Sequence, residues 1–265
     1  DLGFETPSEV QEKAIPLLLE GDIDLVALAQ TGTGKTAAFG FPLIQKIDSN
    51  SRTTQGLILS PTRELCMQIT NEMQLYSKYV KGVNVVAIYG GASITDQARQ
   101  IKRGAQIVVA TPGRMKDMIG RGLVDISKID YCILDEADEM LNMGFYEDIQ
   151  DILSNTPKEK STWLFSATMP NEIQSLANSI LTNPAKVEVT PISSTANTID
   201  QSIFFAEKKD KNNLLVHLLK DKEIRSALVF TRTKHGADKV VKVLATANVK
   251  AAAIHGNKSQ NARQA

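Results

Sequence analysis

The chain has 265 residues, of which 42% are hydrophobic, and its 30 basic and 30 acidic side chains leave no net charge. This composition is that of a folded, soluble protein with one large or two ordinary domains. No apolar run reaches the roughly 18 residues of a membrane span and no signal-peptide pattern opens the chain, so we expect a cytoplasmic protein. Because the first residue is Asp1 rather than Met, we also expect a fragment of a longer protein.

Short apolar runs alternate with helical stretches along most of the chain. The predicted strands span residues 24–29, 56–60, 83–89, 107–110, 131–134, 162–165 and 186–189. Helix start signals precede Glu9 and Glu172, where a Pro accompanies a capping residue. This alternation predicts an α/β fold in which a parallel sheet carries helices on both faces.

Small polar residues with a Pro replace this pattern at residues 191–198, which we interpret as a linker. It separates a complete domain, residues 1–190, from a second βα series, residues 199–265. That series has predicted strands at 199–206, 227–230 and 250–254 and helices near 209–220 and 234–247. About 65 residues are too few for a doubly wound domain, so we expect only the first part of one.

Charge is distributed unevenly between the two halves. From Glu207 onward, thirteen Lys and Arg stand against five Asp and Glu, an excess of eight positive charges. This stretch is either a surface for a polyanion or the solvated face of a lysine-rich helix carrying Lys234, Lys239 and Lys242. Among the apolar residues, Cys132, Trp163, Phe204 and Phe205 are expected in the core.

A glycine-rich segment, AQTGTGKT at residues 29–36, follows the first predicted strand and opens a helix. In that context successive backbone N–H groups and the helix N-terminus can surround phosphate oxygens. Lys35 would reach the β and γ phosphates, and the Thr36 hydroxyl would bind Mg²⁺. The first position is Ala29 where the strict pattern has Gly, and the alternative is a chance glycine-rich turn.

Two carboxylates, Asp135 and Glu136, follow the apolar run 131–134 at the edge of the sheet where ligands bind. Asp135 would bind Mg²⁺, directly or through water, and Glu136 would orient or deprotonate an attacking water. Acidic pairs at the start of a helix are often only partners of its dipole. Together with the segment at Lys35, however, the pair favours nucleotide chemistry.

Seven short segments of the first 190 residues stand in an order and spacing typical of one family. They are GFETPSEVQ (3–11), AQTGTGKT (29–36), PTREL (61–65), GG (90–91), TPGR (111–114), DEAD (135–138) and SAT (166–168). In this order they resemble the Q motif, motifs I and Ia, the paired-glycine motif, and motifs Ib, II and III of the DEAD-box ATP-dependent RNA helicases, superfamily 2 proteins of bacterial type. VFTR (229–232) resembles motif IV, and His255-Gly256 with Gln260 and Arg263 resembles the family's Gln-x-x-Arg element.

The resemblance implies RecA-like domains, ATP and Mg²⁺ as cofactors, and a set of site residues. The implied catalytic residues are Lys35, Asp135, Glu136, Ser166 and Thr168, with Thr36 and Asp135 at the metal. Gln11, with Thr6 and Phe4, would hold the adenine. The phosphate-binding residues would be Gln30, Thr31, Gly32, Thr33, Gly34, Lys35 and Thr36.

RNA is the partner that the resemblance implies, held by backbone contacts that carry no base code. The implied RNA-binding residues are Pro61, Thr62, Arg63, Gly91, Thr111, Gly113, Arg114, Gln260 and Arg263. RNA-processing or ribosome-assembly proteins would be further partners of a monomer. The sequence contains neither motif V nor motif VI, nor the upstream aromatic that the family stacks on adenine, so we expect residues 1–265 alone to be inactive.

Three alternatives to an RNA helicase stay open at this point. An ATP-gated RNA clamp or scaffold would carry the same motifs without needing turnover. A small-molecule P-loop kinase would use Lys35 and Asp135, although the Q motif and motif Ib argue against it. DNA in place of RNA is disfavoured by the resemblance, and only contacts to the 2′-hydroxyl separate the two.

Overall fold

The computed structural model describes residues 5–189, 200–221, 223–259 and 262–263. The chain forms two compact units, Asp1–Ser193 and Ser194–Ala265, hereafter the first and the second unit. The predicted linker at residues 191–198 lies outside the described residues. Each unit is therefore described by itself.

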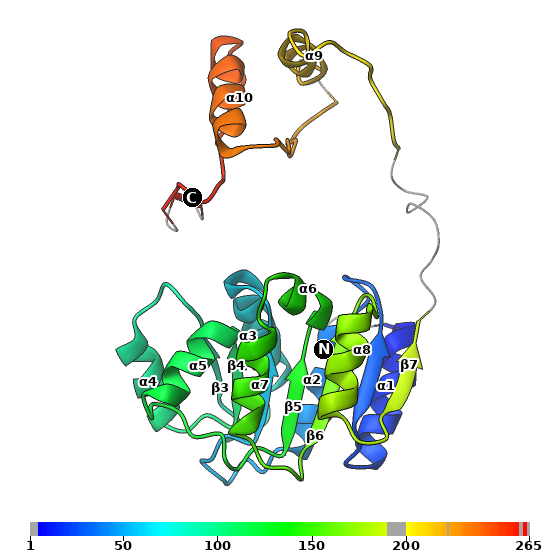
Figure 1. Cartoon of the computed structure of the whole chain (residues 1–265), viewed down its shortest axis with the longest axis vertical. Coiled ribbons are helices and arrows are strands. Elements are labelled where there is room, and N and C mark those ends of the chain that lie inside the picture. The colour runs from blue at the N-terminus through cyan, green and yellow to red at the C-terminus, as the bar shows by residue number, and fades with distance from the viewer. Residues whose placement is uncertain (1–4, 190–199, 222, 260–261, 264–265) are drawn as a thin grey trace. The chain divides into compact units, whose positions relative to one another are not determined.

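The first unit is built on a seven-stranded sheet whose strand order is β3-β4-β2-β5-β6-β1-β7 (Figure 1). All neighbouring strands pair in parallel. The strands are β1 (Leu25–Leu28), β2 (Gly56–Leu59), β3 (Val85–Ile88), β4 (Ile107–Ala110), β5 (Tyr131–Leu134), β6 (Ser161–Ser166) and β7 (Ala185–Glu188). All seven strands expected from the sequence are confirmed: β4 and β5 have the expected ends, and the ends of the others differ by at most two residues.

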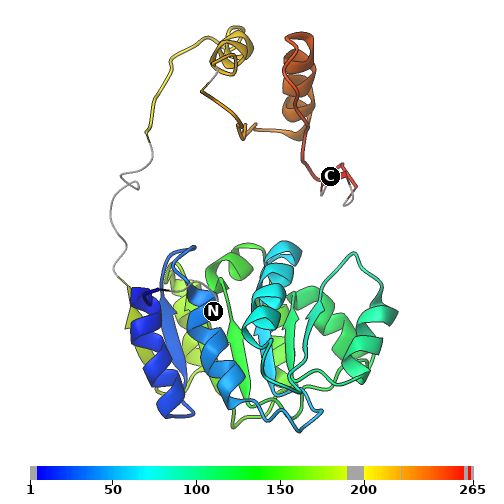
Figure 2. The ribbon, with the colours of Figure 1, turned by 180° about the vertical axis from the view of Figure 1, so that it is seen from behind.

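Helices cover both faces of this sheet, as Figures 1 and 2 show from opposite sides. One face carries α1 (Glu9–Glu20), α2 (Lys35–Lys46) and α3 (Arg63–Tyr76). The other carries α4 (Ile94–Lys102), α5 (Pro112–Gly120), α6 (Ala137–Asn142), α7 (Tyr146–Ser154) and α8 (Asn171–Ile180). Because both faces are covered, the central strands are apolar along their whole length rather than alternating.

Two hydrophobic cores result, one on each side of the sheet. Trp163, on β6, is completely buried beneath α1 and α2, and the Phe165 ring packs edge-on against Phe39 of α2 with 5.3 Å between centroids. Cys132 is also fully buried, and burial raises the pKa of its thiol to about 12. Trp163 and Cys132 therefore confirm the core positions expected for them.

The strand order decides where the chemistry of the first unit can lie. In a parallel sheet every strand ends at the same edge, and ligands of open α/β sheets bind at that edge. The glycine-rich segment follows β1 and the DEAD segment follows β5, with β6 between them. The segments PTREL, TPGR and GG follow the adjacent strands β2, β4 and β3. The motifs for which the resemblance implies nucleotide binding and those for which it implies RNA binding thus lie on neighbouring halves of one edge of the sheet.

The second unit contains α9 (Lys211–Leu218) and α10 (Lys234–Thr246), close to the two helices expected there. The strands expected at 199–206, 227–230 and 250–254 are wrong for the described residues, because no neighbouring segment pairs with them. Lys234, Lys239 and Lys242 lie exposed on α10.

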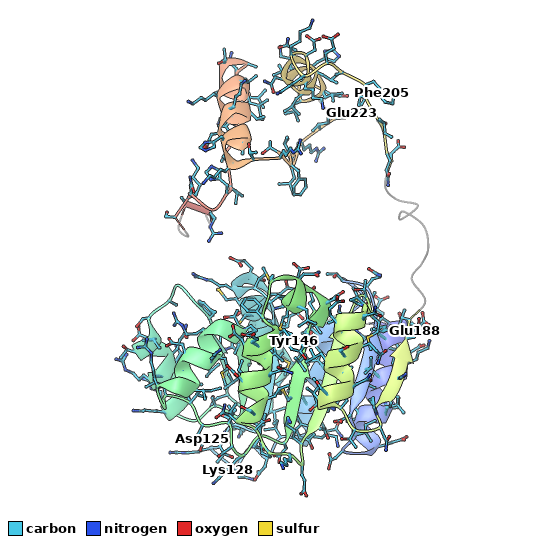
Figure 3. All side chains as sticks on the ribbon, viewed as in Figure 1. Asp125, Lys128, Tyr146, Glu188, Phe205 and Glu223 are labelled. Atoms are coloured by element: carbon cyan, nitrogen blue, oxygen red, sulfur yellow. The ribbon has the colours of Figure 1, made fainter. Side chains whose placement is uncertain are left out.

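The expectation that Phe204 and Phe205 are core residues is also wrong. Their side chains are 57% and 97% exposed, and Phe205 extends away from the ribbon in Figure 3. Both residues lie in a segment without a strand partner, so no sheet face is available against which the rings could pack. Within the described ranges, no helix has the length and apolar composition to cross a lipid bilayer.

Candidate functional site

The glycine-rich segment joins β1 to α2 in the conformation of an anion-binding loop. Gly34, the N-cap of α2, has a left-handed backbone with φ of 86°, and a Cβ there would overlap the Gln11 amide. Lys35 is 6% exposed, and its ammonium donates to the carbonyl of Ala29 over 3.1 Å. The Thr33 hydroxyl closes the loop by donating to the Gln30 carbonyl at 2.7 Å. The N–H groups at the start of α2 are thereby presented at the edge of the sheet.

Gln11 connects the start of α1 to this loop. Its Nε2 donates to the Gly34 carbonyl at 3.1 Å, while its Oε1 accepts from the Ser8 backbone N–H at 3.0 Å. The side chain is 8% exposed. Each amide atom keeps a second hydrogen-bonding position, so the same side chain can hold the loop and contact a base. Thr6, by contrast, is exposed, and Phe4 lies outside the described residues.

The acidic pair follows β5 on the other side of β6. Asp135 is 3% exposed, and burial raises the pKa of its carboxyl group to about 6, while the nearby Lys35 ammonium acts in the opposite direction. Glu136 has a left-handed backbone with φ of 51°, which is costly for a residue with a Cβ. Its carboxylate accepts a long hydrogen bond, 3.4 Å, from the hydroxyl of Thr31 in the phosphate loop.

Ser166 and Thr168 meet the DEAD segment at Asp138 rather than at Asp135. Asp138 accepts from the Thr168 backbone N–H at 3.0 Å and from its hydroxyl at 2.8 Å. The Ser166 hydroxyl accepts from the Asp138 N–H at 3.3 Å and donates to the Thr168 carbonyl at 2.8 Å. Partial burial alone would raise the pKa of Asp138, but these hydrogen bonds lower it below its usual value. The end of β6 and the start of α6 are thus tied together.

A buried carboxylate at Asp135 and the Thr36 hydroxyl on the first turn of α2 are ligands suited to Mg²⁺. Burial raises the pKa of Asp135 in spite of the nearby Lys35 ammonium, so the negative charge of Asp135 is only partly compensated, and a divalent cation would add to that compensation. In the described part of the chain no three His, Cys, Asp or Glu side chains cluster to form a protein cage.

Arginines mark the other half of the edge. Arg63 is the first residue of α3, and its guanidinium lies 4.8 Å from the centroid of the Tyr89 ring at the end of β3. Gly91 lies beside that guanidinium, since a Cβ there would lie 3.4 Å from Arg63 Nη1, and its φ of 80° is a left-handed backbone that favours glycine. Arg63 is therefore held against the β3–α4 loop.

Arg114 lies on the first turn of α5, beside the same loop. Its Nη1 donates to the Ala92 carbonyl at 3.1 Å and to Gln97 Oε1 at 3.3 Å. Thr111 is the N-cap residue of α5, and Gly113 is exposed on its first turn. The two arginines thus converge on residues 89–92 from opposite sides.

The remaining residues expected to bind RNA divide between the two units. Pro61 is buried, and Thr62 caps α3 by accepting from the Leu65 N–H at 3.2 Å. Arg263 belongs to the second unit, where its N–H donates to the Ser259 carbonyl at 3.1 Å. Gln260 lies outside the described residues.

Two residues of this edge were not expected from the sequence. Tyr89 directly follows β3 and Gln97 lies in the first turns of α4, and neither stands in a recognised motif. A lone glutamine on a polar helix gives no signal of burial, and only the folded chain brings it beside Arg114.

Comparison with known proteins agrees with the arrangement of these segments. The DEAD/DEAH box helicase family matches residues 8–176. The chain is 40% identical over its whole length to "ATP-dependent RNA helicase DeaD" of Haemophilus influenzae, and 45% identical over 99% of its length to "ATP-dependent RNA helicase CshA" of Listeria monocytogenes. It spans 43% and 50% of those proteins, respectively, so less than two thirds of either.

A solved structure supports the same assignment. The crystal structure of a DEAD box protein from the hyperthermophile Methanococcus jannaschii is 41% identical, with a TM-score of 0.68 over 99% of this chain and 70% of that one. The parallel sheet of the first unit, with the phosphate loop after β1 and the DEAD segment after β5, is thus RecA-like. The chain belongs to the DEAD/DEAH box helicase family.

Proposed function

We propose that the whole protein is an RNA-dependent ATPase that uses ATP to separate or remodel RNA duplexes and RNA–protein complexes locally. The observation that carries this proposal is the placement of two sets of residues on one sheet edge. The glycine-rich segment 29–36 follows β1 and the acidic pair Asp135 and Glu136 follows β5. Arginine-bearing segments follow the adjacent strands β2 and β4. A small-molecule kinase has no use for the second set.

Each step of the proposed reaction has a residue suited to it. The loop N–H groups and Lys35 hold the triphosphate, and bound Mg²⁺ would neutralise charge on the β and γ phosphates. Glu136 orients and deprotonates the attacking water, for which its contact with Thr31 places it beside the loop. The link from Ser166 and Thr168 to Asp138 would pass the nucleotide state to the rest of the protein.

RNA would lie along the other half of the edge, with its phosphates on Arg63 and Arg114. These are contacts to the backbone, so they hold a strand without reading its sequence. We further propose that residues 199–265 begin a second RecA-like domain, which closes on ATP and RNA and bends the strand out of duplex geometry. Hydrolysis and phosphate release would reverse this closure. We place this activity in the cytoplasm and assign it to a monomer.

The direct test is ATP-driven release of a labelled strand from a short RNA duplex by the whole protein. Strand release that requires hydrolysable ATP supports the proposal. A clamp would hold single-stranded RNA with a non-hydrolysable analogue yet release no strand and turn over little ATP. A kinase would fail to retain single-stranded RNA at all.

Gln11→Ala is expected to narrow the difference between ATP and GTP affinities. The amide supplies both a donor and an acceptor for the adenine edge, and it also holds the Gly34 carbonyl. Loss of one or two such bonds weakens ATP binding by about 3- to 30-fold. Competition of ATP and GTP against a fluorescent nucleotide measures both affinities, with the exposed Gln68→Ala as the matched control. An unchanged preference for adenine would reduce Gln11 to a structural support of the loop.

A further inference from the structure

Gln97 is a buried amide that joins two elements of the arginine-bearing edge. It lies on the first turns of α4 and is 4% exposed, although its neighbours Asp96, Arg99 and Gln100 are exposed. Its Nε2 donates to the Tyr89 carbonyl at 3.0 Å, and its Oε1 accepts from Arg114 Nη1 at 3.3 Å. One side chain therefore connects the end of β3 to the start of α5.

The Tyr89 end of this connection is itself fixed. The Tyr89 ring packs against the Arg63 guanidinium at 4.8 Å, a distance typical of a cation–π contact. Arg63 Nε is buried and has no hydrogen-bond partner within the described part of the chain, so ring packing does much to orient this guanidinium. The β3–α4 loop, whose residue Tyr89 accepts from Gln97, is thus also contacted by Arg63 at the start of α3.

The amide of Gln97 serves both ends of the connection, because it donates at one end and accepts at the other. An apolar residue at position 97 would leave the Tyr89 carbonyl without its side-chain partner, and Arg114 would keep only its bond to the Ala92 carbonyl. An arginine side chain held by one acceptor samples more rotamers than one held by two. A phosphate would then have to order the guanidinium on binding, which weakens binding.

We propose that Gln97 is a positioning residue for RNA binding, which holds the Arg114 guanidinium in the orientation that meets a phosphate. This inference rests on the proposed function, because it takes Arg114 as an RNA contact. It assigns Gln97 no contact with RNA, ATP or the reacting atoms. Its whole effect on RNA affinity passes through Arg114.

A double-mutant cycle tests this dependence. Affinity for a fluorescent single-stranded RNA is measured at low salt, where phosphate contacts are strongest, for the parent chain, Gln97→Ala, Arg114→Ala and the double variant. Gln97→Ala should weaken RNA binding about 5- to 10-fold, which lies within the net contribution of one ordinary hydrogen bond, because Arg114 keeps its second bond to the Ala92 carbonyl. Affinity for a fluorescent adenine nucleotide should stay within about twofold, because the phosphate loop is formed by other elements.

The decisive comparison is between the loss of RNA affinity that Gln97→Ala causes in the parent and the loss that it causes in the Arg114→Ala variant. In the Arg114→Ala chain, adding Gln97→Ala should cause no further loss of RNA affinity. An equal loss in both backgrounds would mean that Gln97 supports the fold in general, and would overturn the inference. Gln100→Ala, on the exposed face of the same helix, is the matched control and should bind RNA as the parent does.

Two further outcomes separate this inference from the proposed function. If Arg114→Ala weakens RNA binding but Gln97→Ala does not, the positioning role fails and the RNA path stands. If Arg114→Ala binds RNA as the parent does, Arg114 is no RNA contact. The positioning role of Gln97 and the proposed RNA path then both fail at Arg114. Gln97→Met keeps the length of the side chain while removing both hydrogen bonds, and replaces Gln97→Ala in the cycle if that variant does not fold.

Discussion

In the whole protein, Lys35→Ala is expected to abolish measurable ATP hydrolysis and to weaken nucleotide binding strongly. In the proposed assignment the Lys35 ammonium meets the β and γ phosphates, and removing one such stabilising group from a transition state costs roughly 10²- to 10³-fold in rate. Lys35 also opposes the effect of burial on Asp135, so its loss raises the pKa of that carboxyl group further. Steady-state hydrolysis and fluorescent-nucleotide titration measure the two effects.

Lys46→Ala provides the control, because Lys46 ends the same helix at the opposite edge of the sheet. There it pairs with Asp22 at 3.0 Å and faces no phosphate. Thermal unfolding of both variants separates lost binding from lost folding. Nucleotide affinity and turnover at the parent level in Lys35→Ala would disprove the phosphate-loop assignment.

Glu136→Gln is expected to bind Mg-ATP normally and to hydrolyse it about 10²- to 10⁴-fold more slowly, the usual contribution of a general base. The amide keeps the shape of the carboxylate and can still contact the Thr31 hydroxyl, but it cannot accept a proton at neutral pH. A fall in kcat with an unchanged nucleotide dissociation constant would identify a group that acts in the transition state.

Glu139→Gln is the matched control, since Glu139 is exposed one turn further along α6. It should turn over ATP as the parent does. If Glu136→Gln lost nucleotide binding instead, Glu136 would hold the metal or the fold, and the base would have to be sought elsewhere.

The sheet of the first unit could be predicted because its strands are buried on both sides. Runs such as 107–110 and 131–134 are apolar throughout, and the structure gives these strands the predicted bounds. The observed strand ends differ from the expected ones where pairing with a neighbouring strand, rather than composition, decides where the strand stops. At β6, for example, the strand extends beyond the apolar run because Ser161 pairs with Tyr131 of β5 at one end and Ser166 pairs with Leu28 of β1 at the other.

The second unit shows the limit of that reasoning. Residues 227–230 have the composition of a buried strand, yet Leu228 is 77% and Phe230 is 88% exposed. Composition records which residues suit a sheet, whereas a strand exists only where a neighbour pairs with it. No such neighbour occurs among the described residues.

At the site, the motifs indicate which residues gather but not how they are joined. The resemblance implies that Ser166 and Thr168 belong to the site without naming their partner, and the fold joins them to Asp138. The left-handed backbone of Glu136 has no sequence signal, because such strain is imposed by the surrounding structure. Gln97 is similar, since its importance comes from a contact between α4 and α5.

The most direct test of the proposed function is the steady-state ATPase rate of the whole protein with and without single-stranded RNA. We predict a rate that rises with RNA to saturation, and an Arg114→Ala variant that needs more RNA to reach it while keeping the rate without RNA. Equal ATPase rates with and without RNA, in protein free of contaminating ATPase, would contradict the account.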